Sequence, residues 1–269
     1  MTATRWPCEA IRQAIEPGLP GFAVEVVPEI DSTNAELMRR ARAGRFDPVL
    51  LVAEHQLTGR GRMGRQWVDC PDTPGKPGSL MFSLGVTLSP QDWSGLSLAI
   101  GLSLAESLHP DIALKWPNDL WWHDRKLAGV LVETVNWGGD AARNSRFTVI
   151  GVGINILPPK ANGLSTAPAG LAEITSGVGA VQALACVAAP LVQTLRRFEQ
   201  HGFAPLRAAF NARDALAEVA VTLSDGRHGT AQGVDATGAL LVLTAQGLQR
   251  VTSAEVSVRP MVAPCAHLV

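Results

Sequence analysis

The stretch GRGRMGRQW (residues 59–67) contains the glycine spacing G-x-G-x-x-G, which in dinucleotide-binding proteins joins a strand to a helix. A continuous apolar run, PVLLVAEHQ (48–56), precedes it and predicts a buried strand. A helix cannot follow, because the chain enters a segment with three prolines within seven residues (71–77). Arg60 and Arg62 would also crowd the close backbone approach that a pyrophosphate requires. The stretch is therefore not a dinucleotide-binding turn.

The arginines of this stretch indicate a different use. Arg60, Arg62 and Arg65 can each make charge-assisted, often bidentate hydrogen bonds to phosphate or carboxylate. The interleaved glycines give the backbone freedom to move. The phosphate-loop pattern G-x-x-x-x-G-K-[ST] occurs nowhere in the sequence, which argues against a phosphate-loop NTPase. Taken alone, the stretch leaves two interpretations open: a loop that grips an anion, or a cluster of solvated surface charge.

Hydrophobic periodicity and chain-breaking residues predict regular elements on both sides of this loop. Residues 31–43 (DSTNAELMRRARA) form a predicted helix, with a capping box from Thr33 to Glu36 and a stop at Gly44. The other expected elements are strands over 48–56, 80–88, 112–117 and 147–156, a hairpin over 119–135, and helices over 93–108, 180–200 and 203–213.

The pattern changes after about residue 214, where short β-branched runs alternate with turn dipeptides. Asp-Gly (225–226), Thr-Gly (237–238) and Gln-Gly (246–247) lie at hairpin spacing. The sequence therefore predicts a small all-β domain that follows a mixed domain of helices and strands.

Composition limits the classes of function. The 269 residues suffice for one large domain and a small one, and 46% of them are hydrophobic, as in ordinary globular proteins. The formal net charge of -1 gives no general basic surface for nucleic acid. Any anion-binding function must therefore come from a local cluster, and the arginines of residues 59–67 are the best candidate.

Cysteine usage and the N-terminal segment indicate a cytoplasmic protein. The four cysteines (8, 70, 186 and 265) show neither metal-ligand spacing nor a disulfide pattern. The first eighteen residues carry charges and prolines where a signal peptide needs an apolar segment. No run approaches the roughly 18 apolar residues of a membrane span, so we expect no membrane partner.

Five short motifs, each weak when taken singly, occur together in this chain. They are DSTN (31–34), EHQLTGRGRMGRQW (54–67), KWPNDL (115–120), RKLAGVLVE (125–133) and GVGINI (151–156). In this order they resemble the biotin–protein ligases, or biotin–[acetyl-CoA-carboxylase] ligases. The resemblance runs from about residue 30 to the C-terminal segments RFEQHGFAPLRAAF (197–210) and GVDATGALLV (233–242).

The resemblance implies an α+β fold. It predicts a mixed, largely antiparallel sheet with helices packed on it, as in class II aminoacyl-tRNA synthetases and in biotin and lipoate ligases. A small C-terminal Src-homology-3-like β-barrel should follow. We therefore expect a catalytic biotin- and ATP-binding domain over residues 1–213 and the barrel over residues 214–269.

The resemblance also implies an ATP-dependent reaction in two steps. Biotin and MgATP would form biotinyl-5′-AMP, and biotin would then pass to a specific lysine of a biotin carboxyl carrier protein. That carrier is a domain of a biotin-dependent carboxylase such as acetyl-CoA carboxylase. ATP and Mg²⁺ act as co-substrates and biotin as substrate, without a tightly bound prosthetic group. The first step sets a carboxylate against a phosphate, so positive charge is required where the two anions meet.

By resemblance, Lys126 and Arg62 are the catalytic residues that supply this charge. The residues implied for biotin are Ser32, Thr33, Asn34, Gln56, Gly59, Arg60, Gly61, Arg62, Lys126 and Gly129. The residues implied for ATP and the adenylate are Arg62, Arg65, Trp67, Lys115, Asn118 and Asn155. Trp67 would stack on adenine, and Asp119 is the implied magnesium ligand.

The chain also departs from the family pattern. Met63 stands where many members carry arginine, so its side chain is expected to face away from the phosphate. The proline-rich stretch 70–79 is longer than usual and should alter the rim of the pocket. About 30 residues precede DSTN, fewer than the DNA-binding domain of the repressor members requires, so we expect no nucleic-acid binding. Some members pair through a sheet edge, and the sequence leaves a homodimer open.

Two alternatives remain at this point. A lipoate ligase or octanoyl transferase shares the general architecture, although the combination of GRGRMGRQW, KWPND and GVGIN is not expected there. A catalytically idle biotin-binding regulatory module is the other, and Lys126, Arg62 and Arg65 argue against it.

Adjacent Trp121 and Trp122 should face opposite sides of a strand.

Overall fold

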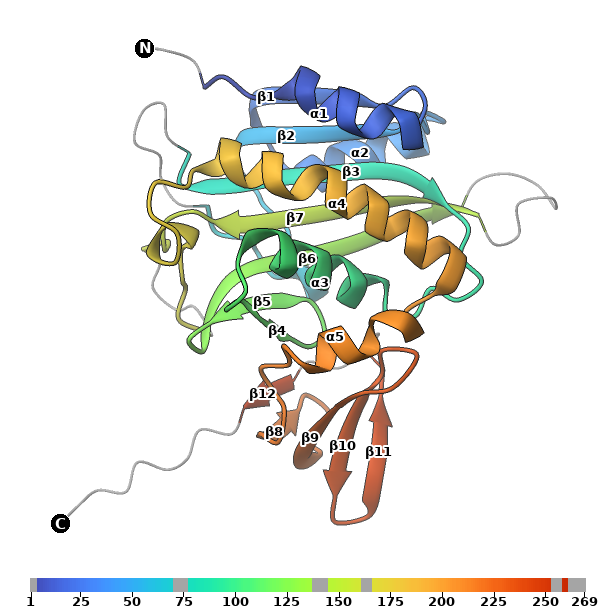
Figure 1. Cartoon of the computed structure of the whole chain (residues 1–269), viewed down its shortest axis with the longest axis vertical. Coiled ribbons are helices and arrows are strands. Elements are labelled where there is room, and N and C mark those ends of the chain that lie inside the picture. Colours follow the sequence, from blue (N-terminus) through green and yellow to red (C-terminus); the bar gives the residue numbers. More distant parts are fainter. Residues whose placement is uncertain (1–3, 70–76, 137–144, 161–165, 253–257, 261–269) are drawn as a thin grey trace.

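The computed structural model describes residues 4–69, 77–136, 145–160, 166–252 and 258–260 (Figure 1). Its strands are β1 (Ala23–Ile30), β2 (Val49–Gln56), β3 (Ser79–Leu88), β4 (Ala113–Lys115), β5 (Asp119–Trp122), β6 (Arg125–Asn136), β7 (Arg146–Asn155), β8 (Ala220–Leu223), β9 (His228–Val234), β10 (Leu240–Thr244), β11 (Gly247–Val251) and β12 (Val258–Pro260). Its α-helices are α1 (Cys8–Ile15), α2 (Thr33–Arg42), α3 (Leu96–Leu108), α4 (Ala180–His201) and α5 (Arg207–Asn211).

The larger sheet has seven strands in the order β1-β2-β3-β7-β6-β5-β4. β1 pairs with β2 in parallel, and every other neighbouring pair is antiparallel. The mixed, largely antiparallel sheet that the resemblance implies is therefore confirmed. β1 and α1 were not predicted, whereas the strands and the hairpin that carry the motifs lie within a few residues of their expected positions.

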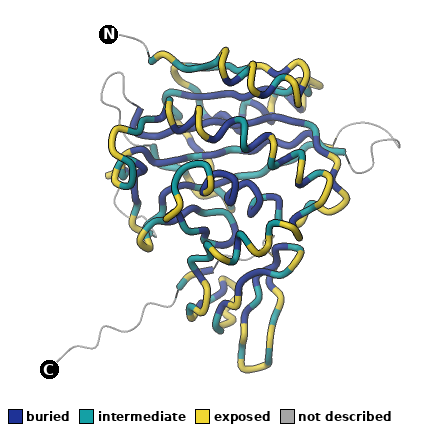
Figure 2. The backbone as a smooth tube through the Cα atoms, in the orientation of Figure 1, coloured by how far each residue is buried: buried dark blue, intermediate teal, exposed yellow. Residues whose placement is uncertain are grey.

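Side chains alternate between the two faces of this sheet, and the two faces have different coverings. On one face, residues such as Leu50, Phe82 and Ile150 form the main core together with α1, α3 and α4. On the other face, Leu51 and Val149 belong to a smaller core beneath α2. Figure 1 shows α1, α3 and α4 in front of the sheet with α2 behind it, and Figure 2 shows the buried strands between them. The rest of the α2 face carries Trp67, Lys126, Gly129 and Gly153 from the motifs.

Helix α2 begins differently from the prediction. Ser32 is the N-cap, and its Oγ accepts a hydrogen bond from the backbone N–H of Ala35. The predicted capping box from Thr33 to Glu36 is therefore wrong. Thr33 already lies inside the helix, and both its backbone N–H and its hydroxyl contact Gln56 of β2. The Thr33 hydroxyl, which would have capped the helix locally, is instead used in a tertiary contact with Gln56.

The five strands β11-β10-β9-β8-β12 form a separate antiparallel sheet, in the place expected for the small C-terminal barrel. The predicted turns are confirmed by positive φ angles of 88° at Gly226, 80° at Gly238 and 101° at Gly247. The two parts are in contact, because the indole N–H of the buried Trp116 donates to the Gly238 carbonyl at 3.1 Å. The domain boundary after residue 213 stays a prediction.

The carboxyl group of Asp214, which lies at this junction, should make stability depend on pH. Burial raises the pKa of Asp214 to about 6 from its usual 3.8, and Oδ2 has no hydrogen-bond partner within the described chain. Between these two pKa values the folded state binds the proton and the unfolded state does not. The free energy of unfolding therefore falls as the pH rises through this window, and it stays lower above it. The loss is about 3 kcal/mol.

The variant Asp214→Asn should remove this pH dependence. We expect urea denaturation to show a more stable variant at about pH 7 and equal stabilities near about pH 4. Equal stability at both pH values would contradict the prediction.

In the part of the chain that the structure describes, no helix is long and apolar enough to cross a membrane.

Candidate active site

Two glycines form the floor of the site on the α2 face of the sheet. Gly129 of β6 and Gly153 of β7 are direct partners across the two strands. The indole of Trp67 lies over them, because a Cβ atom on Gly153 would come within 2.6 Å of Trp67 Cε2. On Gly129 a Cβ would lie 3.4 Å from Trp67 Cζ3 and from Lys126 Nζ. The absence of side chains at both positions thus makes room for a ring on the sheet.

A β-bulge turns Lys126 toward this floor. The register between β5 and β6 shifts after Leu120, which leaves Leu127 as an extra residue on β6. Leu127 and Ala128 both face the main core, so Lys126 returns to the same face as Gly129. Its Nζ lies 2.7 Å from Asp119 Oδ1 and 5.8 Å from the centre of the Trp67 ring. A regular strand would have placed Lys126 in the core.

Several cations surround the single carboxylate of Asp119. Burial lowers the pKa of Lys115 and that of Arg62, and the charge of Asp119 opposes both shifts. Lys115 Nζ also lies 5.5 Å from the centre of the Trp121 ring. One carboxylate cannot neutralise this group, so this end of the site favours an anionic ligand.

The loop of residues 59–67 is a narrow hairpin. The Trp67 N–H donates to the Gly59 carbonyl at 2.9 Å, and the Gly61 N–H donates to the Arg65 carbonyl at 2.7 Å. Residues Arg62–Gly64 make a single 3-10 turn at its tip, where Met63 has a left-handed φ of 55° and is 59% exposed. Whether Met63 faces away from a bound phosphate stays a prediction.

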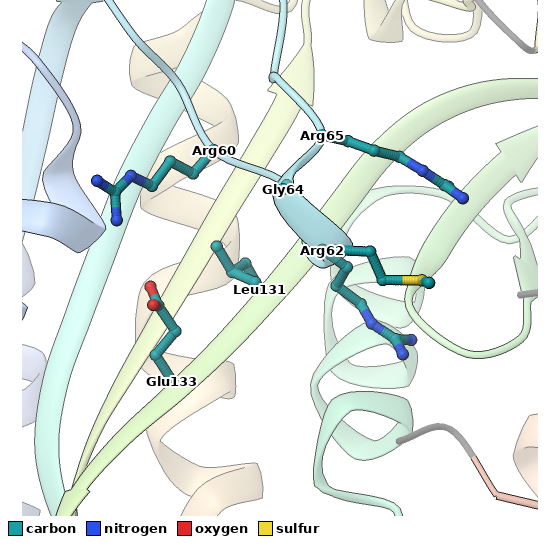
Figure 3. A pocket seen from close by; sticks show the side chains of 8 residues that line it. Arg60, Arg62, Gly64, Arg65, Leu131 and Glu133 are labelled. Atoms are coloured by element: carbon teal, nitrogen blue, oxygen red, sulfur yellow. The ribbon is translucent and has the colours of Figure 1, made fainter. Parts of the chain in front are cut away.

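A cavity of 340 Å³ lies between this hairpin and strand β6. Figure 3 shows Arg60 extending to one side of it and Arg62 and Arg65 to the other, with Leu131 and Glu133 beneath. The cavity therefore has two chemically different ends. The lining residues are Arg60, Gly61, Arg62, Met63, Gly64, Arg65, Leu131 and Glu133.

A polar network continues from the Glu133 side of the cavity. Asn34 Nδ2 donates to Glu133 Oε2 at 2.9 Å, and Ser83 Oγ lies 2.6 Å from Asn34 Oδ1 and 2.7 Å from Thr33 Oγ1. The Thr33 backbone N–H donates to Gln56 Oε1 at 2.8 Å. Thr33, Asn34 and Ser83 are buried. The network supplies fixed hydrogen-bonding groups beside the Glu133 end of the cavity.

Sequence reasoning missed Ser83 and Glu133. The signal for Ser83 was a hydroxyl in the middle of the run LMFSLGVTL (80–88), whose other polar residue is Thr87, and Glu133 ends the motif RKLAGVLVE. Gly151 makes room for the network, because a Cβ there would overlap the side-chain oxygen of Asn34.

Asn118 and Asn155, which the resemblance assigns to ATP, make hydrogen bonds to backbone carbonyls at the side of this floor. Asn118 Nδ2 donates to the Val130 carbonyl at 2.8 Å. Asn155 Nδ2 donates to the Ala169 carbonyl at 3.1 Å and lies 3.3 Å from the Lys126 carbonyl. Asn155 Oδ1 is buried and has no hydrogen-bond partner among the described residues. The role of both residues toward adenine stays a prediction.

Of the remaining residues that the resemblance implied, some stabilise the surrounding structure and others lie in the site. Ser32 is buried and caps α2, whereas Gly59 begins the loop opposite Trp67, where a Cβ would come 2.9 Å from the Trp67 carbonyl oxygen. Trp121 is buried and Trp122 half-buried, as expected for neighbours on a strand. Residues 70–76 of the proline-rich stretch, with Cys70, and also Cys265 lie outside the described residues.

Magnesium binding by Asp119 also stays a prediction. Over the described ranges no group of three His, Cys, Asp or Glu side chains could hold a metal ion. Nucleotide-bound Mg²⁺ commonly takes only one or two carboxylates together with phosphate oxygens, so Asp119 fits an ion that arrives with ATP. Such binding would compete with the Asp119–Lys126 ion pair.

Comparison with known proteins places this geometry in a family. Residues 26–155 match the biotin/lipoate A/B protein ligase family, and residues 218–259 match the biotin protein ligase C-terminal domain. The bifunctional ligase/repressor BirA of Escherichia coli is 35% identical over 235 residues, which cover 83% of this chain and 70% of BirA. The biotin–[acetyl-CoA-carboxylase] ligase of Paracoccus denitrificans is 32% identical over 84% of this chain and 96% of its own length.

A solved structure gives the same result. The biotin protein ligase of Aquifex aeolicus, in complex with biotin and ATP, superimposes with a TM-score of 0.72. Its sequence is 27% identical, and the match covers 88% of this chain and 99% of that one. The resemblance read from the five motifs is thereby confirmed, and the chain belongs to the biotin–protein ligase family.

Proposed function

We propose that this protein is an ATP-dependent biotin–protein ligase, which forms biotinyl-5′-AMP from biotin and MgATP and then transfers biotin to a carrier-protein lysine. The observation that carries the proposal is the two-ended cavity. Arg62 and Arg65 extend to one end, and Glu133 with its polar network lies toward the other. One end suits phosphate and the other a small polar ring.

The cationic end suits the chemistry of adenylation. A carboxylate oxygen of biotin attacks the α-phosphorus of ATP, and pyrophosphate leaves. Lys126 and Arg62 would offset the negative charge that concentrates as the two anions meet. Because the ion pair with Asp119 holds Lys126 in place before the reaction, little reorganisation of this group is needed. In the second step an acceptor-lysine amine attacks the acyl carbon, and AMP leaves.

The loop of residues 59–67 would retain the reactive intermediate. Its glycines allow it to move, and its arginines can bind the phosphate of the adenylate. Closure over the bound intermediate would exclude water from the mixed anhydride.

The polar end of the cavity favours biotin as the substrate over the lipoyl and octanoyl groups that other proteins of this fold use. Biotin carries a cyclic urea with two N–H donors and one carbonyl acceptor, whereas lipoyl and octanoyl groups have none of these at the corresponding end. Buried polar groups that a ligand leaves unpaired cost affinity. Thr33, Gln56, Ser83 and Asn34 would therefore discriminate against an apolar acyl chain.

The proposed partner is a biotin carboxyl carrier domain, as the name of the Paracoccus denitrificans relative indicates. We also propose a cytoplasmic location, which the free thiols of Cys8 and Cys186 support. The net charge of -1 supports a function without nucleic-acid binding. A homodimer stays a proposal, for which the edge strand β1 offers one pairing surface.

The test of this function is exchange of labelled pyrophosphate into ATP. We expect biotin to support exchange and lipoate and octanoate not to. Exchange with lipoate or octanoate alone would assign the chain to the other branch of the fold. Biotin binding without any exchange would favour the idle regulatory module.

Arg62→Gly should release the intermediate. Loss of a charge-assisted contact to the adenylate phosphate is expected to shorten retention of biotinyl-5′-AMP by roughly 10- to 100-fold. Gel filtration of enzyme loaded with labelled biotin measures the retained fraction. Arg227→Gly, on the exposed β8–β9 turn, is the matched control. Unchanged retention by Arg62→Gly would contradict a clamping role.

A further inference from the structure

Four side chains form one continuous hydrogen-bonded chain beneath the polar end of the cavity. They are Thr33 and Asn34 of α2, Ser83 of β3 and Glu133 of β6. The three contacts that join them measure 2.7, 2.6 and 2.9 Å. Of the four, only Glu133 is not buried, and it lines the cavity on the side toward which Arg60 extends (Figure 3).

Glu133 determines the direction of every hydrogen bond in this chain. A carboxylate can only accept, so the amide nitrogen of Asn34 must face it. The Asn34 carbonyl oxygen therefore faces Ser83, and the Ser83 hydroxyl has to donate to it. Having given up its only proton, Ser83 can only accept from the Thr33 hydroxyl.

At the Thr33 end of the chain there are fewer hydroxyl protons than contacts, so two acceptor oxygens are left facing each other. The Thr33 hydroxyl also lies 3.1 Å from Gln56 Oε1, which already accepts the Thr33 backbone N–H at 2.8 Å. A single hydroxyl proton must serve two contacts, and the 2.7 Å contact to Ser83 is the shorter. Thr33 Oγ1 and Gln56 Oε1 thus face each other as two acceptors. A ligand N–H that approaches both oxygens from one side would relieve this repulsion.

We infer that Glu133 is a specificity-determining positioning residue that sets this polarity through Asn34 and Ser83. Its charge makes the pocket accept N–H groups, which a cyclic urea offers and an acyl chain does not. Glu133 acts without donating to the ligand itself. The inference rests on the proposed biotin ligase function and adds to it the group that selects the substrate class.

The test moves the carboxylate from residue 133 to its hydrogen-bond partner, residue 34, and compares the double variant with each single variant. In Asn34→Asp two carboxylates face each other, and we expect the biotin Kd to rise by roughly 10- to 100-fold. In Glu133→Gln the amide can present either atom to Asn34, so the direction is no longer fixed, and we expect a rise of about 3- to 10-fold. In the double variant the carboxylate on α2 accepts both from Ser83 and from the new amide on β6, which restores the direction. Its Kd should return to within about threefold of wild type.

The distinguishing result is that adding Asn34→Asp to Glu133→Gln improves biotin affinity. A role in fold stability alone would be repaired by the same swap, so the melting temperature of each variant is measured as well, and we expect it to change far less than the biotin Kd. The KM for ATP should stay within about twofold in all three variants, because the cationic end is unchanged. Glu36→Gln, which removes an ion-paired carboxylate from the arginine side of α2, is the control for helix stability.

The outcomes separate the inference from the function on which it rests. Failure of the wild-type protein to bind biotin would overturn the proposed function. A double variant that binds biotin more weakly than Glu133→Gln, while the wild type binds it normally, would overturn the role of Glu133 alone. That comparison holds even if Asn34→Asp by itself fails to fold, since Glu133→Gln keeps an acceptor for Asn34.

Discussion

Replacing Lys126 with methionine is expected to lower the rate of biotinyl-5′-AMP formation by about 10²- to 10³-fold. The bulge after Leu120 aims the Lys126 ammonium group at the site, and it lies beside Asp119 at the cationic end. Methionine keeps the length and apolar stem of the side chain but removes its charge. The charge that develops between biotin carboxylate and phosphate would then lose its nearest compensation on β6.

Single-turnover formation of the adenylate at saturating biotin and ATP measures this rate directly. The chemical step should fall far more than the biotin Kd rises, because the charge matters most in the transition state. Lys160→Met, at an exposed lysine, is the matched control. A Lys126→Met enzyme with a wild-type rate would exclude Lys126 from the reaction.

Adding one methyl group to Gly153 should disrupt the ATP end of the site. The new Cβ would come within 2.6 to 2.9 Å of three atoms of the Trp67 indole, so the ring must leave the floor. Stacking of a base on an aromatic ring contributes about 1–3 kcal/mol, so we expect Gly153→Ala to raise the KM for ATP by roughly 5- to 100-fold.

Gly129→Ala provides a graded comparison on the opposite strand. Its Cβ would meet Trp67 and Lys126 at 3.4 Å, a contact that small shifts relieve, so the KM for ATP should change less. Thermal melting of both variants shows whether the sheet itself is intact. Equal KM values for the two variants would contradict a floor on which Trp67 has to rest.

Local patterns predicted much of this fold. The apolar runs gave β2, β3 and β7, and the turn glycines at 226, 238 and 247 gave the C-terminal hairpins. β1 was missed because Pro28 and two glutamates interrupt its apolar pattern. Its partner β2 lies across a helix in the sequence, and parallel pairing of this kind leaves no local signal.

Some residues of the candidate site could likewise be predicted from the sequence, and others could not. Arg62, Arg65 and Lys126 could be named from the sequence because few residue types hold phosphate, and the motifs limit where they stand. Ser83 and Glu133 could not, because their importance comes from Asn34, which lies 49 residues from one and 99 from the other. Their side chains meet only after α2 has packed on the sheet.

The sequence by itself determined the chemistry available to this protein: the arginines and glycines of residues 59–67, the lysine of RKLAGVLVE, and the turns that limit each strand. Tertiary structure alone decided which way these groups face. The bulge brings Lys126 out of the core, two paired glycines hold the Trp67 ring, and one carboxylate orients a chain of hydrogen bonds. The physical reason is that strand register and side-chain direction depend on partners far along the chain, whereas residue type and turn propensity are local.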